Sequence, residues 1–271
     1  MKKVKINNIH IKPLKTDLIE DPRLPKGFEI FGKNVTPNVF FLAMKGKGKT
    51  VSLGNILKLC IDDRTIVLVF SPTIHQDKSH IGIRQFCDKK NIEYHGYPST
   101  VDDRGNNILK ILQRQLEEES EVREEASKKI SKLTEEQLRR FLFNDPEPKI
   151  RKRKYKVPDY VIVIDDLREE LRSSVIKSLI QRNRHYRIMV ILSSQYSKDL
   201  HPASLHNIDN SLVFGKQPIE HIKKLKTDFS LDIDLNDLVE MYKDATNEKY
   251  SFLFIDINDN KYRKRLNEGY V

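Results

Sequence analysis

The chain has 271 residues, which suits one large α/β domain or a core domain with a smaller appendage. Its 49 Lys and Arg residues exceed its 39 Asp and Glu residues, and the formal charge of +10 favours polyanionic partners such as nucleic acids or nucleotides. Two cysteines exclude a disulfide scaffold and favour a reducing compartment. The sequence predicts neither a secretory signal nor the apolar run of roughly 20 residues that a membrane span needs.

The first part of the chain alternates between apolar and amphipathic segments. Residues 1–38 are predicted to form a basic N-terminal arm with strands, rich in lysine and interrupted by prolines. Buried strands are predicted over Asn38–Ala43 and Thr65–Phe70, and helices over Thr50–Cys60 and Ile81–Asn91. Strands that are buried on both sides and alternate with helices predict a parallel sheet covered on both faces.

This pattern is interrupted between residues 102 and 158. Asp102–Phe143 is dense in Glu, Lys, Arg and Leu, which predicts two or more amphipathic helices. The following Lys149–Lys156 has six basic residues in eight positions and prolines on both sides, so we expect a loop or linker there. We therefore predict that 102–158 is a helical insertion with a basic linker, which serves as a lid or as a subunit contact.

The core resumes at residue 159. The apolar runs that we expect as strands are Tyr160–Ile164, Arg187–Leu192, Asn210–Phe214 and Tyr250–Ile255. A helix is expected after the first of them, with Leu167, Leu171, Val175 and Leu179 on one face, and further helices are expected over Pro218–Lys226 and Leu235–Lys243. The predicted division is thus an arm (1–38), a first part of the core (39–101), an insertion (102–158) and a second part of the core (159–271).

The strongest motif follows the first predicted strand. The segment Ala43–Thr50 reads AMKGKGKT and matches the phosphate-binding loop G-x-x-x-x-G-K-[ST], with Ala43 in place of the first glycine. Gly46 and Gly48 allow backbone N–H groups to curl around a phosphate without a Cβ in the way. A lysine-rich surface turn is the alternative, but the motif has a buried strand before it and an amphipathic helix after it. The expected fold is therefore that of a P-loop NTPase.

The loop also carries the polar side chains that such a site uses. Lys49 is expected to reach the β- and γ-phosphates of ATP, and the Thr50 hydroxyl to bind Mg²⁺. Lys45 and Lys47 add two positive charges within the loop. These two lysines contact either the nucleotide, a phosphate at a subunit border, or water.

Two acidic residues end the strand over Tyr160–Ile164. We expect Asp165 to hold Mg²⁺ and Asp166 to orient and deprotonate the attacking water. Such a pair is common on its own, but a phosphate loop upstream in the chain strengthens the assignment. Asp62 and Asp63 also form a pair, but they follow the loop's own helix, so we expect them to cap a turn far from the phosphates.

Two further residues are expected to complete the catalytic set. Gln195 follows a predicted strand, where an amide can hydrogen-bond both the lytic water and a phosphate oxygen, although a plain polar loop would also explain it. Arg184 is a candidate for reaching the γ-phosphate of a neighbouring subunit. The alternative is a basic helix end that complements the helix dipole, and this explanation is favoured for Arg182 and Arg187.

Two weaker patterns remain. His75, His80, Cys87 and His95 do not have the spacing of a zinc finger or knuckle, so we do not expect a metal site there. The centre of the basic run is formed by Arg151, Lys152, Arg153 and Lys154, which are candidates for contacting DNA phosphates or for a nuclear address. A solvated loop explains the run equally well.

Taken together, AMKGKGKT, VLVFSPT, YVIVIDDL and RNRHYRIMVILSSQYSKDLHPASLHNIDNSLVF resemble the genome-packaging ATPases of large DNA viruses, virophages and polinton-like elements, within the FtsK–HerA superfamily. The resemblance implies a RecA-like core that uses ATP and Mg²⁺ to translocate double-stranded DNA into a preformed capsid. It also implies a homo-oligomeric ring, pentameric or hexameric, that contacts viral capsid vertex proteins. The implied location is the host cytoplasm, a viral factory or the virion.

The sequence departs from this family at four positions. Asn183 stands where glycine is expected, His206 where an arginine often precedes Asn207, and Asp166 where many relatives have Glu. The fourth is Ala43, a small residue that the first loop position tolerates. Two alternatives therefore stay open: another P-loop DNA motor, such as a helicase or conjugation-type motor, and a small-molecule P-loop kinase. The acidic pair, Gln195 and the basic charge favour a motor that activates water over a kinase.

Overall fold

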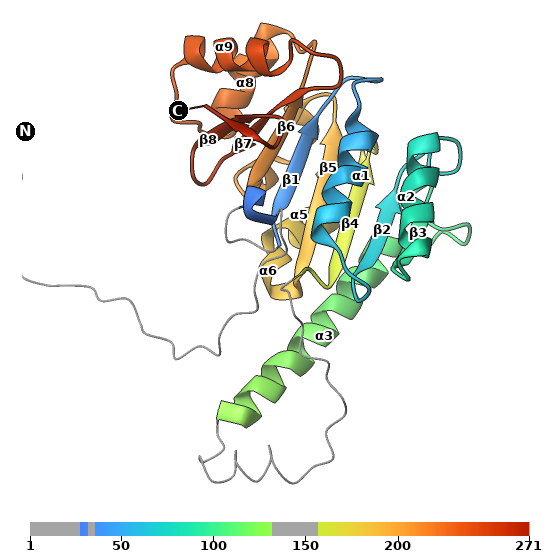
Figure 1. The fold of residues 1–271 in the computed structure, drawn as a ribbon. Coiled ribbons are helices and arrows are strands. Elements are labelled where there is room, and N and C mark those ends of the chain that lie inside the picture. The colour runs from blue at the N-terminus through green and yellow to red at the C-terminus, as the bar shows by residue number, and fades with distance from the viewer. Residues whose placement is uncertain (1–27, 32–35, 132–156, 271) are drawn as a thin grey trace, which may run out of the picture.

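The computed structural model describes residues 28–31, 36–131 and 157–270 (Figure 1). Within these ranges, the side chains of 28, 29 and 124–131 are not described. Most of the expected N-terminal arm lies outside the described residues. The basic run also lies outside them, and with it Arg151, Lys152, Arg153 and Lys154.

A mostly parallel sheet runs through the molecule, in the order β3-β2-β4-β5-β1-β6-β7-β8-β9. The strands are β1 (Asn38–Leu42), β2 (Ile66–Phe70), β3 (Glu93–Tyr97), β4 (Tyr160–Asp165), β5 (Ile188–Ser194), β6 (Asn210–Phe214), β7 (Phe252–Asp256), β8 (Lys261–Lys264) and β9 (Glu268–Gly269). The strands from β3 to β6 are parallel, and β7, β8 and β9 add an antiparallel edge. The expected parallel sheet is confirmed, whereas β3, β8 and β9 were not predicted.

Helices cover both faces of the sheet (Figure 1). The α-helices are α1 (Lys49–Cys60), α2 (Lys78–Lys89), α3 (Ile108–Ser131), α5 (Ser174–Gln181), α6 (Asn183–Tyr186), α7 (Pro202–Leu205), α8 (Ile219–Asp228) and α9 (Leu235–Ala245). Short 3₁₀ turns are η1 (Phe28–Phe31), η2 (Glu170–Arg172) and η3 (Ser197–Asp199). The α1 and α2 helices pack on one face with η1, and α3, α5, α8 and α9 pack on the other. In the parts of the chain that the structure describes, no helix is long and apolar enough to cross a membrane.

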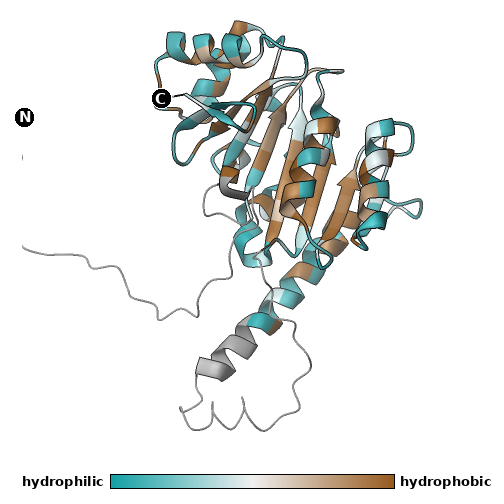
Figure 2. Ribbon diagram, viewed as in Figure 1, coloured by the Kyte–Doolittle hydropathy of each residue, from teal (hydrophilic) through white to brown (hydrophobic). Residues whose placement is uncertain are grey.

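The apolar strands explain why both faces are covered. In β1, Val39 and Phe41 belong to the core under α1, while Phe40 and Leu42 belong to the core under α5 and α8. Successive side chains of a strand point to opposite faces, so a continuous apolar run requires packing on both. Figure 2 shows the central strands as continuous hydrophobic bands between helices whose outer sides are hydrophilic.

The sheet order determines which strand ends meet. The β1 strand lies between β5 and β6, and β5 separates it from β4. In the register, Leu42 is opposite Ser194, and Asp165 is opposite Ser193. The N–H of Ala43 continues the pairing by donating to the Ser194 carbonyl at 3.0 Å. The segments that follow β1, β4 and β5 therefore lie side by side at the carboxyl ends of these parallel strands.

The helix expected with Leu167, Leu171, Val175 and Leu179 on one face is wrong as a single element. Leu167 lies in a loop, Leu171 in η2, and only the later residues lie in α5. The break occurs at Ser173, whose hydroxyl accepts a hydrogen bond from the N–H of Ile176 at 3.3 Å. Ser at this position satisfies a free N–H group and starts a new helix.

The expected insertion begins with a helix that packs on the core. Leu109, Leu112 and Leu116 of α3 are buried against the sheet. A side-chain oxygen of Asn107 accepts from the N–H of Lys110 at 2.9 Å and caps this end of the helix. Figure 1 shows α3 running on past the end of the sheet. Up to Ser131 the structure therefore has one long helix, and residues 132–156 lie outside the description.

Candidate functional site

The loop between β1 and α1 depends on two glycines. Gly46 has φ 76° and Gly48 has φ 88°, in the left-handed region where a side chain is strained. Gly48 is the N-cap of α1, and its carbonyl accepts from the N–H of Ser52 at 3.0 Å. The free N–H groups of the first helical turn and the helix dipole therefore point into the space above the loop, which is an arrangement suited to a phosphate.

A cavity of about 590 Å³ opens above this loop. Its lining joins the loop to the ends of β4 and β5 and consists of residues 44–51 with Thr73, Gln76, Asp77, Ser79, Asp165, Asp166, Gln195 and Tyr250. Of the residues that the sequence assigns to the site, the structure brings together Lys45, Gly46, Lys47, Gly48, Lys49, Thr50, Asp165, Asp166 and Gln195. Ala43 is the exception among the loop residues, because it is buried behind the cavity and does not line it.

Lys49 connects the loop to both acids. Its ammonium lies 2.8 Å from Asp165 Oδ1 and 2.7 Å from Asp166 Oδ2. The Lys49 side chain is only 12% exposed, so this contact is shielded from solvent. A lysine held between two carboxylates at the mouth of a phosphate loop can exchange those partners for phosphate oxygens.

Asp165 is held as an ionised carboxylate. Burial by itself raises its pKa, but hydrogen bonds from His80 and Ser193 and the charge of Lys49 together hold the pKa well below its usual range. The imidazole Nε2 of His80 lies 3.2 Å from Asp165 Oδ2, and the Ser193 hydroxyl donates to Oδ1. An ionised carboxylate and the Thr50 hydroxyl on one cavity wall form the hard oxygen donor set that Mg²⁺ prefers.

Asp166 has a different environment from its neighbour. Its side chain is 46% exposed, and its backbone has φ 57°, a conformation that Asp tolerates better than most residues. This turn directs the carboxylate to the cavity mouth rather than into the core. Gln195 follows β5 and lines the same cavity. The two acids of the pair therefore differ in burial, and their expected division into a metal ligand and a base stays a prediction.

Arg184 lies away from this cavity. Its guanidinium is 3.6 Å from Asp209 Oδ1, at the end of the sheet where β1 and β6 begin. Asp209 Oδ2 also accepts from the N–H of Asn38 at 2.8 Å. Arg184 thus cannot serve the nucleotide site of its own chain, and its predicted action on a neighbouring subunit stays a prediction.

The other arginines near Arg184 have structural partners. Arg182 Nη1 lies 3.4 Å from Glu117 Oε1 on α3, and Arg187 Nη1 lies 3.6 Å from Asp159 Oδ2. Both arginines thus have partners within the chain, and the helix-dipole explanation that the sequence favoured for them stays a prediction. Asp62 lies in the turn after α1, where its carboxylate accepts from the N–H of Arg64 at 3.0 Å.

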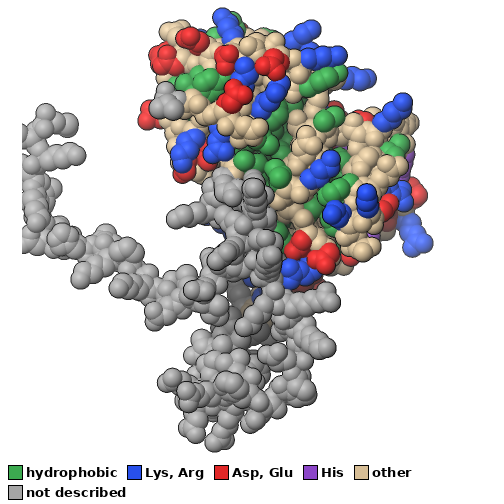
Figure 3. Space-filling model, in the orientation of Figure 1, with side chains coloured by type: hydrophobic (Ala, Val, Ile, Leu, Met, Phe, Trp, Pro, Cys, Tyr) green, Lys and Arg blue, Asp and Glu red, His purple; other side chains and the backbone are tan. Residues whose placement is uncertain are grey.

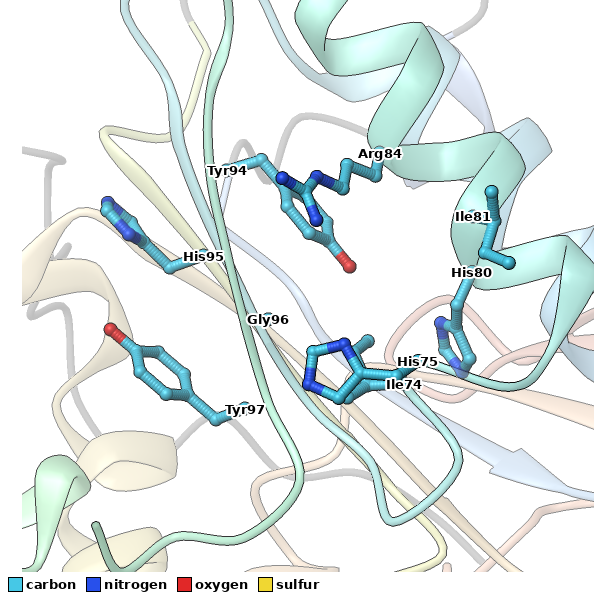
Figure 4. A pocket seen from close by; sticks show the side chains of 9 residues that line it. All are labelled: Ile74, His75, His80, Ile81, Arg84, Tyr94, His95, Gly96 and Tyr97. Carbon is cyan, nitrogen blue, oxygen red and sulfur yellow. The ribbon is translucent and has the colours of Figure 1, made fainter. Parts of the chain in front are cut away.

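The histidines near α2 have different partners. His75, His80 and His95 line a second cavity of about 330 Å³ between α2 and β3, whereas Cys87 does not (Figure 4). His80 is committed to Asp165, and His95 Nε2 lies 2.8 Å from Glu93 Oε1. Among the described residues there is no group of three or more side chains that could hold a metal ion.

Several residues at or behind the site were not predicted from the sequence, among them Thr73, Gln76, Asp77 and Ser79 of the lining. Two others make close contacts there: His80 reaches Asp165 from α2, and Tyr250 precedes β7 and lies against Gly48. Neither has a local signal, because His80 lies on an ordinary amphipathic helix and Tyr250 is remote from the loop in the chain. Their proximity to the loop arises only when α2 and β7 pack beside it.

Positive charge is concentrated at the loop itself. The pKa of Lys47 is lowered, first by desolvation and then by the nearby charge of Lys216. Two ammonium groups this close favour the binding of an anion between them. By contrast, Figure 3 shows Lys and Arg side chains scattered over the face in view, among acidic and apolar ones, without a single basic patch.

Comparisons with known proteins give weak sequence similarity to one viral protein and similarity to several solved structures. No family model matches the chain. It is 26% identical over 102 residues to the uncharacterized protein 075L of Invertebrate iridescent virus 6, an alignment that covers 36% of this chain and 40% of that protein. The alignment thus spans only about two fifths of the viral protein.

Among solved structures, the chain is similar to the genome packaging NTPase B204 of Sulfolobus turreted icosahedral virus 2, with 16% identity and a TM-score of 0.49. That match covers 85% of this chain and 97% of B204. It is also similar to the cytoplasmic domain of the Type VII secretion ATPase EccC of Thermomonospora curvata, with 13% identity and a TM-score of 0.45 over 80% of this chain and 24% of EccC. The sheet order, the glycine loop and the paired acids described above are, by their own geometry, those of a P-loop NTPase.

Proposed function

We propose that this protein is an ATP-hydrolysing translocase of double-stranded DNA that packages a viral genome into a preformed capsid. The observation that carries the ATPase part is the position of Lys49, which joins the phosphate loop to Asp165 and Asp166 beside Gln195. These four side chains supply a phosphate contact, a metal ligand, a base and a group that positions water.

The geometry suggests how hydrolysis proceeds. The N–H groups of the loop and of the first turn of α1 bind the phosphates, and Lys49 leaves the carboxylates to contact the β- and γ-phosphates. Thr50 and Asp165 would hold Mg²⁺, which when bound neutralises charge on the phosphate oxygens. Asp166, exposed at the cavity mouth, accepts the proton of the attacking water, and Gln195 orients that water.

The positions of Asp166 and Gln195 favour water over a second substrate as the attacking group. Asp166 and Gln195 both reach an open cavity lined by polar side chains from several elements. A small-molecule kinase needs a further binding surface for its acceptor next to the γ-phosphate. The cavity beyond His80 is separated from Lys49 by the buried His80–Asp165 contact. The acidic pair beside Gln195 and the formal charge of +10 rank the kinase below the motor.

The DNA part of the proposal rests on charge and on the sequence motifs. The formal charge of +10 is suited to backbone phosphates, and the motifs around the loop and the acids resemble those of genome-packaging ATPases. We further propose that the protein works as a homo-oligomeric ring, pentameric or hexameric, on capsid vertex proteins, in the host cytoplasm, a viral factory or the virion. A helicase or conjugation-type motor is the main competing function.

The decisive measurement is the rate of ATP hydrolysis with and without double-stranded DNA. A packaging motor should hydrolyse ATP slowly alone and faster on long duplexes of any sequence, with less stimulation by single strands. Preference for single strands would favour a helicase. Hydrolysis that duplex DNA leaves unchanged, together with no duplex binding at low salt, would contradict the motor and favour the kinase.

A further inference from the structure

The phosphate cavity has an apolar side that phosphates and metal do not need. Met44, Val51 and Tyr250 all line it, and their exposed fractions are 37%, 58% and 55%. Apolar side chains that gather at one site can form a surface for a ligand. The cavity therefore suits a ligand that has an apolar part as well as negative charge.

Tyr250 lies over the loop in an unfavourable backbone conformation. Its φ of 65° lies in the left-handed region, which is rare for an aromatic residue. The Tyr250 side chain packs so closely on Gly48 that a Cβ added there would lie 3.0 Å from Tyr250 Cβ and 3.1 Å from Cδ1. The ring is thus fixed beside the phosphate loop rather than swinging freely in solvent.

A third cavity also borders Tyr250. It measures about 340 Å³ and shares Gly46, Lys47 and Tyr250 with the phosphate cavity. Its remaining lining comes from the segments before β7 and after β6, namely Gly215, Lys216, Thr246, Asn247, Glu248, Lys249 and Ser251. Tyr250 therefore stands between a space suited to phosphates and a smaller space with polar walls.

We propose that Tyr250, with Val51, forms the surface on which the base of the bound nucleotide packs, with the triphosphate on the loop. This assignment rests on the proposed ATPase function and deepens it by naming the side chains that contact the base. The Lys249 ammonium, now 4.8 Å from the centre of the Tyr250 ring, is exposed and can move aside for the base. Base–aromatic packing contributes through any aromatic ring, so its strength depends on the ring and not on the hydroxyl.

The first test separates the base from the phosphates. Tyr250→Ala should weaken ATP binding by about tenfold and leave the binding of inorganic tripolyphosphate unchanged. Tyr250→Phe should bind ATP like the wild type, because it keeps the ring. Val122→Ala is the matched control, since Val122 is 67% exposed on α3 and lines neither cavity. Equal reductions in affinity for ATP and tripolyphosphate in Tyr250→Ala would overturn the proposal and reduce Tyr250 to a support for Gly48.

The second test uses fluorescence. The chain has no tryptophan, so Tyr250→Trp places a single tryptophan at the proposed contact, and its emission can be excited selectively over that of the tyrosines. ATP should quench its emission and tripolyphosphate should not, while Val122→Trp should respond to neither. Emission from Tyr250→Trp that ATP leaves unchanged, although ATP still binds, would overturn the base contact and spare the ATPase function. If the wild-type protein binds neither ATP nor tripolyphosphate, the proposed function falls and this inference with it.

Discussion

The buried imidazole of His80 donates a hydrogen bond to Asp165, with 3.2 Å between Nε2 and Oδ2. This contact joins α2 to the end of β4. The other ring nitrogen, Nδ1, is buried without a hydrogen-bond partner among the described residues, so the contact with Asp165 fixes the orientation of the ring. His80 therefore helps to position the proposed metal ligand.

Lys49→Ala should abolish ATP hydrolysis, because it removes the charge that contacts the transferred phosphoryl group. It also leaves Asp165 and Asp166 facing each other without the cation that they now share. Hydrolysis assays on a variant shown to be folded by circular dichroism test this. Lys58→Ala, at the far end of the same helix, should retain full activity. Turnover near the wild-type rate in Lys49→Ala would contradict the site.

Substitutions of Asp165 and Asp166 should have different effects on nucleotide affinity and on turnover. Asp166→Asn should bind ATP with Mg²⁺ nearly as the wild type does and lose turnover, since a base acts only in the chemical step. Asp165→Asn should weaken Mg²⁺-dependent binding, because it removes the buried charge at the metal position. Titrations of nucleotide with and without Mg²⁺ distinguish them. Equal effects on affinity would argue against this division of roles.

His80→Ala should make the site more sensitive to acid. The pKa of Asp165 is depressed, so the stability that its carboxylate contributes is fully present above the usual carboxyl pKa of about 3.9 and declines as the pH falls through the lower folded-state pKa. Removal of the His80 hydrogen bond raises that folded-state pKa. The pH at which half of the Mg²⁺-dependent nucleotide binding remains should therefore move upward, by roughly one unit.

The matched control for His80 is His95→Ala, since His95 is exposed and pairs with Glu93 rather than with Asp165. Its pH profile should overlay that of the wild type. A profile of His80→Ala that also overlays the wild type would show that Asp165 does not depend on the imidazole.

Arg184 should act across a subunit border. Mixtures of Arg184→Ala with Asp166→Asn should recover part of the hydrolysis rate, because some interfaces then pair an intact arginine with an intact acid. Arg187→Ala is the control, since Arg187 pairs with Asp159 and its substitution should leave activity unchanged. Absence of recovery at every mixing ratio, in mixtures shown to assemble, would leave Arg184 as a partner of Asp209 alone.

The basic run should contribute to DNA binding. Changing Arg151, Lys152, Arg153 and Lys154 to Gln should flatten the salt dependence of duplex binding, by a log–log slope of up to about 0.9 for each phosphate that the protein no longer neutralises. Basal hydrolysis should survive and DNA stimulation should fall. A control variant changes four lysines of α8 and α9 instead, namely Lys223, Lys224, Lys226 and Lys243. An unchanged salt slope in the first variant would mean that the run is only a solvated loop.

Most of the central fold follows from local sequence. The β1, β4, β5 and β6 strands lie close to the predicted runs, because an uninterrupted apolar segment with β-branched residues has few alternatives to a buried strand. The strands near the two edges of the sheet could not be predicted in this way. Strand β3 reads EYHGY and has no fully buried side chain, and β8 has one, Tyr262. Such strands form because a neighbouring strand offers hydrogen bonds, which no local pattern records.

What the sequence by itself determined is the loop with its two glycines, Lys49 and Thr50, and the acids that end β4, because each is a contiguous motif with local geometry. Only the tertiary structure decided that β5 lies between β1 and β4, that His80 supports Asp165, and that Tyr250 lies over Gly48. These contacts join residues that are far apart in the chain, and they exist because the apolar faces of α1, α2 and the sheet pack in only one arrangement.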